Sequence, residues 1–255
     1  MSVIGINGKI NSGKDTIGKI IQYLTANEEV KKITTLEEWL DSDDLNGRDF
    51  NWKIKKYAGK LKQTASLLTG IPVEMFEDQE FKKTALGPQW NYNDIIGYGH
   101  HNVPVYGESE QEMLVRELLQ KLGTEAMRDG LHTNVWCNAL FSDYKPVCNK
   151  FESKMLQTGG NYTSSICSDC NCFPNWCITD MRFPNELEAV KERKGVTIRV
   201  IRDYALRGGP EDPKNIHPSE TALDDAKFDY EIINDGTIED LVEKVREILI
   251  KENII

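Results

Sequence analysis

Short apolar segments alternate along the chain with segments whose apolar residues recur every three or four positions. The short apolar runs, which are typical of buried strands, occupy residues 2–6, 54–58, 176–180, 196–201 and 230–233. Helical periodicity occupies residues 17–24, 61–70, 110–128, 134–141, 186–194 and 238–250. Strands that alternate with helices predict an α/β fold of three layers, in which helices flank both faces of a mostly parallel sheet.

Three segments lack a clear period, and we interpret them as insertions into a single domain that spans residues 1–255. Residues 28–50 are acidic and are expected to form a surface excursion. Residues 84–107 are rich in Gly, Pro, Asn and aromatic residues, which is typical of an ordered loop or a mobile flap. Residues 145–174 hold many Ser and Asn residues and four of the six cysteines.

The charge balance limits the partners that the chain can bind. With 31 Lys and Arg residues against 41 Asp and Glu residues, the formal net charge is −10. Such an acidic surface argues against broad binding to nucleic acid or to anionic membranes. No apolar run approaches the roughly 20 residues that cross a bilayer, and the N-terminus lacks the features of a secretion signal. We therefore expect a cytoplasmic protein whose cysteines are reduced.

A glycine-bearing segment lies between the first expected strand and the first expected helix. Residues 8–14 read Gly-Lys-Ile-Asn-Ser-Gly-Lys, which fits the G-x-x-x-x-G-K pattern of a phosphate-binding P-loop. The glycines let the backbone curl around an anion, the helix adds the positive end of its dipole, and the last lysine places a charge on the β- and γ-phosphates. The alternative is a glycine turn that only opens a helix. The residues that we expect to bind ATP here are Gly8, Asn11, Ser12, Gly13, Lys14, Asp15 and Thr16.

One position departs from the common P-loop pattern. Asp15 follows Lys14, where Ser or Thr usually holds Mg²⁺. Three alternatives are open: Asp15 orders the loop, Asp15 contacts the metal through water, or the hydroxyl of Thr16 takes the metal position. A carboxylate beside a triphosphate would be repulsive unless Mg²⁺ or another cation intervenes. Asp15 and Thr16 are therefore both candidate Mg²⁺ contacts.

Several segments resemble blocks of the bacteriophage deoxynucleoside monophosphate kinases, and they occur in that family's order over most of the chain. They are residues 12–16 (Ser-Gly-Lys-Asp-Thr), 122–125 (Leu-Gly-Thr-Glu) with Trp136, 179–186 (Thr-Asp-Met-Arg-Phe-Pro-Asn-Glu), 217–223 (His-Pro-Ser-Glu-Thr-Ala-Leu) and 234–237 (Asn-Asp-Gly-Thr). The resemblance implies a P-loop kinase fold with an acceptor-binding subdomain and a lid. It also implies an enzyme that uses ATP and Mg²⁺ and transfers phosphate to a deoxynucleoside monophosphate (dNMP), a small-molecule nucleotide.

The resemblance implies an acceptor site as well. It places Lys62 near the acceptor nucleotide and Arg116 at the acceptor phosphate, where an arginine fork suits a phosphate. The alternatives are a solvated helix lysine and an ion pair of Arg116 with Glu112 or Glu117. Three more residues could bind the dNMP. Two of them could offer a backbone amide and a hydroxyl, and the alternative is that they only interrupt a helix. The third could stack its ring on the base, and the alternative is that the ring packs in the core. These three residues are Gly123, Thr124 and Trp136.

Asp180 closes an apolar strand, where ligands of parallel sheets collect. The resemblance lets it contact the metal or the deoxyribose 3′-hydroxyl. Arg182 could clamp the acceptor phosphate, and Glu186 could contact the sugar or brace Arg182. The alternative for this trio is an ion pair at the end of the strand. We therefore expect the catalytic residues to be Lys14, Arg116, Asp180 and Arg182.

Two other groups of residues are weaker candidates. Arg202 and Arg207 flank a charged loop that could close over ATP as a lid or remain solvated. Four cysteines have two interpretations: they could bind a structural Zn²⁺ ion, or they could be free thiols in a loop. They are Cys148, Cys167, Cys170 and Cys172. Cys137 and Cys177 lie in apolar runs and are expected in the core.

Other functions remain open at this stage. A phosphomevalonate kinase-like enzyme can share the Ser-Gly-Lys-Asp loop, and it needs a basic acceptor site but no stacking aromatic ring. A nucleotide-binding regulator would bind ATP without acceptor-dependent release of ADP. The oligomeric state is open too, with a homodimer as one alternative.

Overall fold

The computed structural model describes residues 2–42, 51–146, 173–202 and 221–255. The chain forms two compact units, one from residues 1–57 and 137–255 and the other from residues 58–136. The first unit contains a five-stranded sheet, and the second contains short helices and a two-stranded ribbon.

The sheet of the first unit is parallel throughout, as the sequence predicts. Its strands, in spatial order, are β2 (Trp52–Lys55), β5 (Asn175–Met181), β1 (Val3–Gly8), β6 (Val196–Ile201) and β7 (Tyr230–Ile233). The connection from β1 to β2 runs toward one edge of the sheet, past β5. The connection from β5 to β6 runs toward the opposite edge, past β1. Such a reversal creates a crevice at the carboxyl ends of the strands, where ligands bind in open α/β sheets.

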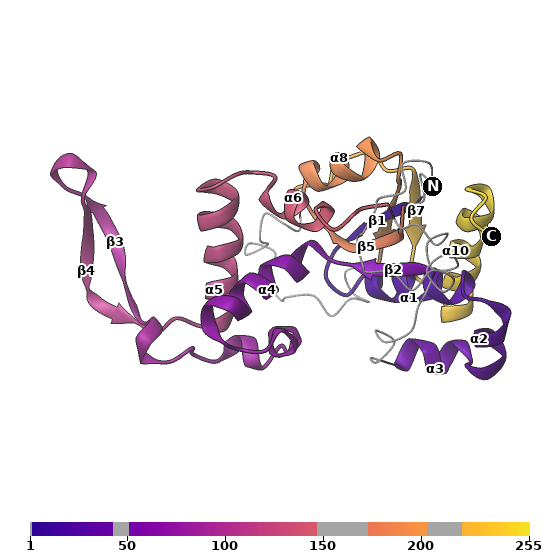
Figure 1. Cartoon of the computed structure of the whole chain (residues 1–255), viewed down its shortest axis with the longest axis horizontal. Coiled ribbons are helices and arrows are strands. Elements are labelled where there is room, and N and C mark those ends of the chain that lie inside the picture. The colour runs from indigo at the N-terminus through magenta and orange to yellow at the C-terminus, as the bar shows by residue number, and fades with distance from the viewer. Residues whose placement is uncertain (1, 43–50, 147–172, 203–220) are drawn as a thin grey trace, which may run out of the picture. The chain divides into compact units, whose positions relative to one another are not determined.

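Helices cover both faces of this sheet (Figure 1). On one face, α1 (Lys14–Leu24) packs beside α10 (Ile238–Lys251), and both present an apolar stripe to the strands. The opposite face is covered by α8 (Pro184–Glu192) and residues of α6 (Val135–Phe141). Because right-handed crossovers in opposite directions place their helices on opposite faces, α1 and α8 lie where the strand order requires them. The predicted three-layer α/β architecture is therefore confirmed.

The two cysteines expected in the core are buried. Cys137 lies in α6 and Cys177 lies in β5. Burial raises the pKa of the Cys177 thiol, so this side chain stays neutral and packs as a small apolar group.

The acidic segment after α1 contains helices that the sequence interpretation missed. They are α2 (Glu28–Ile33) and α3 (Leu36–Asp41). Each is too short to show a clear period, but each begins with a side-chain cap. Asn27 accepts a hydrogen bond from the amide of Val30, and Thr35 forms a capping box with Glu38. These caps stabilise helices that periodicity alone does not reveal.

The second unit has a small apolar core of its own, formed by Ala65, Phe76, Val115, Leu118 and Leu122. Its helical elements are α4 (Tyr57–Thr69), η2 (Val73–Glu77), η3 (Phe81–Lys83), η4 (Pro88–Trp90), η5 (His100–Asn102), α5 (Val115–Gln120) and the π-helix η6 (Lys121–Asp129). The helix expected over residues 61–70 is present, but it begins at Tyr57 and ends at Thr69, before Gly70 with φ of 74°. The strand expected over residues 54–58 is therefore displaced: β2 ends at Lys55, and residues 57 and 58 belong to α4.

Where a loop or flap was expected, the second unit instead forms an antiparallel ribbon. Its strands are β3 (Tyr92–Tyr98) and β4 (Pro104–Gln111). The aromatic and β-branched residues of this segment favour strands, although its Gly and Pro residues obscured the pattern. The helix expected from residue 110 consequently begins only at Val115.

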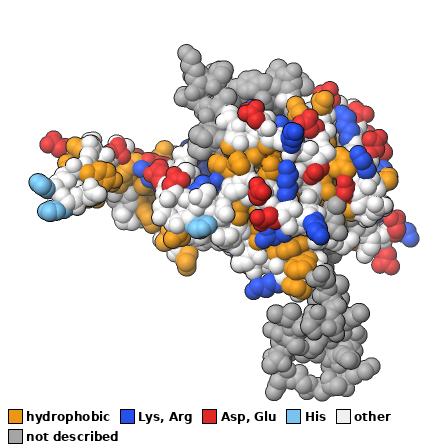
Figure 2. Space-filling model, turned by 90° about the horizontal axis from the view of Figure 1, so that it is seen from above, with side chains coloured by type: hydrophobic (Ala, Val, Ile, Leu, Met, Phe, Trp, Pro, Cys, Tyr) orange, Lys and Arg blue, Asp and Glu red, His pale blue; other side chains and the backbone are white. Residues whose placement is uncertain are grey.

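The ribbon exposes apolar side chains such as Ile96 and Tyr98, which are 70% and 67% exposed. On the face of the molecule shown in Figure 2, basic side chains are interspersed with acidic ones, as expected for an acidic protein without a broad positive field. Among the described residues, no helix combines the length and the apolarity needed to span a bilayer.

Candidate active site

The loop that joins β1 to α1 has the backbone shape of an anion-binding P-loop. Asn11 and Gly13 lie in the left-handed region, with φ of 58° and 100°, and α1 begins at Lys14. A Cβ atom on Gly8 would lie 2.4 Å from Ser12 Oγ and 2.8 Å from the carbonyl oxygen of Val200. Gly8 therefore has no room for a side chain, and the loop curls tightly in front of the N-terminal amides of α1.

Two buried polar atoms at this loop lack hydrogen-bond partners among the described residues. They are the hydroxyl of Ser12, a residue that is 1% exposed, and the Nε atom of Arg202. A buried donor without a partner is costly unless a ligand supplies an acceptor. Phosphate oxygens would supply acceptors to both groups, so these residues fit a bound polyphosphate.

The ends of neighbouring strands hold the loop in place. Asn234, just after β7, donates from Nδ2 to the carbonyl oxygen of Ser12 at 2.9 Å. Arg202, just after β6, donates to the carbonyl oxygen of Asn11 at 3.4 Å. The role of Asn234 was missed from the sequence, although the residue opens one of the segments that resemble the kinase family.

Lys14 bends back over the loop, and its Nζ atom donates to the carbonyl oxygen of Lys9 at 2.7 Å. The positive charge of this side chain therefore lies over the curled backbone. A cation at this position and the helix amides both attract negative charge.

Asp15 is held by two partners from other elements. Thr179 Oγ1 donates to Asp15 Oδ1 at 2.7 Å, and Lys56 Nζ lies 3.0 Å from the same oxygen. Burial favours the neutral acid, but the charge of Lys56 and the Thr179 hydrogen bond outweigh it and hold the pKa of Asp15 below its usual value. These contacts support the alternative in which Asp15 orders the loop. The sequence analysis gave Lys56 and Thr179 no role, although Thr179 opens one of the segments that resemble the kinase family.

The carboxyl end of β5 lies beside that of β1. Asn7 Nδ2 donates to the carbonyl oxygen of Met181 at 2.8 Å, which places residues 180–182 next to the start of the P-loop. Asp180 Oδ1 accepts a hydrogen bond from the amide of Tyr57 at 2.8 Å. An acid at this edge of a parallel sheet occupies the usual place of a ligand contact.

Glu186 braces the turn that carries Arg182. This carboxylate is 3% exposed, and its Oε2 atom accepts hydrogen bonds from the amides of Arg182 and Phe183 at 2.7 and 3.1 Å. Of the two roles considered from the sequence, these contacts support bracing, because they fix the backbone of Arg182. Among the described residues, His, Cys, Asp and Glu side chains form no cluster of three or more that could hold a metal ion.

In the second unit, Lys62 and Arg116 have different surroundings. Lys62 is 8% exposed and pairs with Glu77 at 2.5 Å, so it is not the solvated lysine of the alternative interpretation. Arg116 is exposed, and its nearest described partner is Gln79 Oε1 at 3.5 Å. Glu117 instead contacts Tyr92 and Lys121. The guanidinium of Arg116 therefore retains donors for an anion.

Gly123 and Trp136 belong to a tightly packed part of the second unit, and Thr124, which follows Gly123 in η6, is partly exposed. Gly123 lies in the π-helix η6, a rare element that is often found at functional sites. A Cβ atom on Gly123 would lie 3.0 Å from Leu61 Cδ2, and its carbonyl oxygen accepts a hydrogen bond from Trp136 Nε1 at 2.8 Å. Trp136 is only 6% exposed. These contacts support core packing of the indole rather than stacking on a base.

Several predicted site residues lie outside the described residues. They are Arg207 and the cysteines Cys148, Cys167, Cys170 and Cys172.

Comparison with known proteins extends the agreement over almost the whole chain. A family model described as "Deoxynucleotide monophosphate kinase" matches residues 2–245. The chain is also 27% identical, over 160 residues, to a protein of Acanthamoeba polyphaga mimivirus named "Putative deoxynucleotide monophosphate kinase". This similarity covers 55% of the chain and 68% of the viral protein.

Proposed function

The chain belongs to the deoxynucleotide monophosphate kinase family, and from this premise we propose that it transfers the γ-phosphate of ATP to a dNMP. The products are a deoxynucleoside diphosphate and ADP. Because ATP and the dNMPs are intracellular metabolites, the proposal includes a cytoplasmic location.

The P-loop is the observation that carries the proposal. It combines a curled backbone, a lysine over that backbone and a buried hydroxyl with no partner among the described residues. All three features fit a polyphosphate, which is the part of ATP that reacts. An ordinary helix-opening turn needs none of them.

Phosphoryl transfer requires alignment and positive charge rather than covalent chemistry by the protein. An oxygen of the dNMP phosphate bonds to the γ-phosphorus, while the bond from that phosphorus to the bridging β,γ-oxygen breaks and leaves ADP. Lys14 and the amides of the P-loop stabilise charge on the donor phosphates. Arg182 and Arg116 are each candidates for binding the acceptor phosphate, one in the first unit and one in the second.

Mg²⁺ would accompany ATP and neutralise part of the charge on its phosphates. In this chain the Thr16 hydroxyl would contact it directly, because Asp15 is already held by Lys56 and Thr179. Asp180, at the neighbouring strand end, would contact it through water or bind the 3′-hydroxyl of the acceptor.

A coupled assay of ADP release tests the proposal. The purified chain is supplied with ATP, Mg²⁺ and each deoxy- and ribonucleoside monophosphate in turn, with phosphomevalonate as a comparison acceptor. We expect ADP release that depends on a dNMP. Release with phosphomevalonate alone would indicate the other kinase class, and ATP binding without acceptor-dependent release would indicate a regulator.

A further inference from the structure

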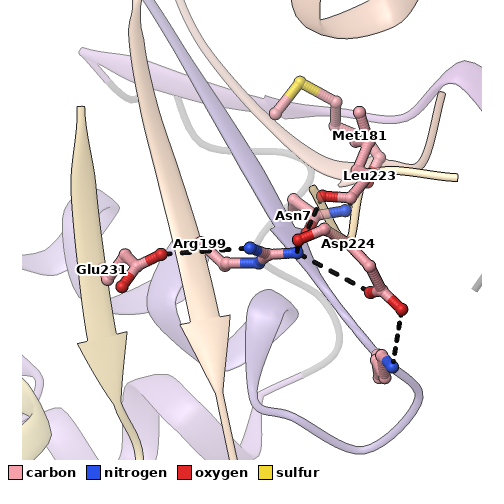
Figure 3. A network of polar contacts seen from close by, with 7 residues as sticks. Asn7, Met181, Arg199, Leu223, Asp224 and Glu231 are labelled. Carbon is pink, nitrogen blue, oxygen red and sulfur yellow. Dashed lines mark hydrogen bonds and ion pairs between the residues drawn. The ribbon is translucent and has the colours of Figure 1, made fainter. Parts of the chain in front are cut away.

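A network of charged side chains connects the P-loop to residues 223 and 224, outside the groups assigned above. Figure 3 shows Arg199 on β6 between Asp224 and Glu231, the latter on β7. Lys9 of the P-loop pairs with the same Asp224. All of these residues belong to the first unit. Sequence analysis gave none of them a role.

Arg199 fixes the position of Asp224. Its Nη2 atom donates to the carbonyl oxygens of Leu223 and Asp224 at 2.7 and 2.9 Å. The guanidinium also lies 3.7 Å from Asp224 Oδ1 and 3.9 Å from Glu231 Oε1. Because this side chain is only 18% exposed, water screens these contacts less than it screens a surface pair. The carboxylate of Asp224 is thus held in one place by both its backbone and its side chain.

Asp224 in turn holds Lys9. Lys9 Nζ lies 3.3 Å from Asp224 Oδ2, and the two side chains are 40% and 43% exposed. A half-exposed pair of this kind is weak, so a more highly charged anion can replace the carboxylate. The carbonyl oxygen of the same Lys9 accepts the hydrogen bond from Lys14. Lys9 is therefore in contact both with the anchored Asp224 and with the principal P-loop lysine.

A cavity of about 280 Å³ lies at this point, lined by Lys9, Ser12, Arg199, Arg202 and Asp224 among others. Its lining combines three cationic side chains, one carboxylate and the Ser12 hydroxyl that lacks a partner among the described residues. A polyanion in the P-loop would consequently gain Lys9 as an additional cation once that lysine leaves Asp224.

We propose that Arg199 and Asp224 are positioning residues that hold Lys9 beside the P-loop, and that a bound polyphosphate takes Lys9 from Asp224. Asp224 therefore lowers the affinity of the P-loop for a polyphosphate, because the polyphosphate must compete with the carboxylate for Lys9. The inference rests on the proposed function only in requiring that the P-loop binds a polyphosphate.

Calorimetric titration of the full chain with inorganic triphosphate and with ATP, at low ionic strength, tests the inference. Asp224→Asn should tighten binding of both probes by about three- to tenfold. Asp225→Asn is the matched control, since it makes the same charge change one residue further on at an exposed side chain. It should change the Kd by less than about twofold.

The Lys9→Met and Arg199→Gln backgrounds show whether the effect passes through the named contacts. In each background, Asp224→Asn should change the Kd by less than about twofold, because either the lysine or the anchor of the carboxylate is missing. In the Glu231→Gln background, which alters only the other carboxylate beside Arg199, the full effect should persist. Thermal unfolding of each variant confirms that it is folded.

Three results would overturn the inference. They are an unchanged Kd in Asp224→Asn, an equal effect of Asp225→Asn, and an effect that survives in Lys9→Met. The proposed kinase activity fails separately: a chain that releases no ADP with any dNMP could still show the predicted changes in triphosphate affinity.

Discussion

Thr179 on β5 donates its hydroxyl hydrogen to Asp15 Oδ1 at 2.7 Å, which ties the residue after the P-loop lysine to the strand that leads to Asp180. The contact joins two elements that are 164 positions apart in the sequence. With the ion pair from Lys56, it fixes the first turn of α1 against the sheet.

Asp15→Asn should therefore reduce stability and change its dependence on pH. The pKa of Asp15 is held below the usual 3.8, so its stabilising effect is complete above that value and is lost as the pH falls through the lowered pKa. We expect a loss of about 1 kcal/mol in the free energy of unfolding at neutral pH, because solvent screens this partly exposed group. Urea unfolding of the variant and of the unmodified chain between pH 2 and 7 measures this loss in the free energy of unfolding. A variant curve parallel to that of the unmodified chain below about pH 4 would contradict the assignment.

Lys14→Ala should abolish phosphoryl transfer without unfolding the chain. The ammonium group of Lys14 donates to a loop carbonyl, that of Lys9, so removal of the side chain costs charge at the phosphates and little packing. We expect the turnover rate to fall by at least about 100-fold, with an unchanged melting temperature. Lys251→Ala, on the exposed side of α10, is the control and should keep full activity. An unchanged turnover rate in Lys14→Ala would refute the loop assignment.

Gly13→Ala should weaken both the loop and the fold. Gly13 has φ of 100°, and a Cβ atom there would lie 2.5 Å from Asn234 Nδ2. We expect a loss of about 1–3 kcal/mol in stability and weaker ATP binding by calorimetry. Gly59→Ala is the comparison, because its Cβ atom in α4 would meet nothing within 4 Å. That change should leave stability equal or raise it by up to about 1 kcal/mol. Equal responses of the two glycines would argue against a conformational requirement at Gly13.

Arg116→Ala and Arg182→Ala should impair use of the acceptor and spare the donor. Loss of a charged hydrogen bond to phosphate costs about 1.5–3 kcal/mol, so the KM for the dNMP should rise by about 10- to 100-fold while the KM for ATP stays nearly constant. Lysine should restore only part of the function, because it lacks the bidentate fork. Arg246→Ala on α10 controls for the change in net charge. A parallel rise in both KM values would make the arginines structural.

Trp136→Leu should separate packing from base stacking. The indole is buried and hydrogen-bonded to Gly123, so its removal should cost about 3 kcal/mol in stability. At a temperature where the variant stays folded, the KM for each dNMP should change by less than about threefold. A stacked ring would contribute about 1–3 kcal/mol to base binding. A large rise in KM with unchanged stability would therefore restore the stacking interpretation.

Periodicity and motif spacing were sufficient for the phosphate loop and for most of the sheet, although β2 spans Trp52–Lys55 rather than residues 54–58. Val196–Ile201 and Tyr230–Ile233 form strands with the predicted bounds, because short β-branched runs between charged segments have few other uses in a folded chain. The glycine loop was recognisable because its chemistry requires a fixed spacing.

Features that depend on tertiary contacts were not accessible in the same way. The bonds of Asn234 with Ser12 and of Thr179 with Asp15 join residues that only the completed sheet brings together. The ribbon β3–β4 was missed because Gly97, Gly99 and Pro104 break the alternation of its apolar residues. Trp136 was matched by residue type alone, and its hydrogen bond to the carbonyl oxygen of Gly123 became visible only in the folded structure.

The hydrogen bond between Ser12 and Asn234 spans 222 positions, so the phosphate loop emerges from the ribosome long before the residue that holds it. An all-parallel sheet offers no early hairpin to bridge that interval, since its neighbours in space are distant in sequence. The P-loop and the residue that holds it are accordingly assembled late in synthesis. Nascent or truncated chains that carry the whole P-loop should still fail to retain ATP until the β7 segment has joined the sheet.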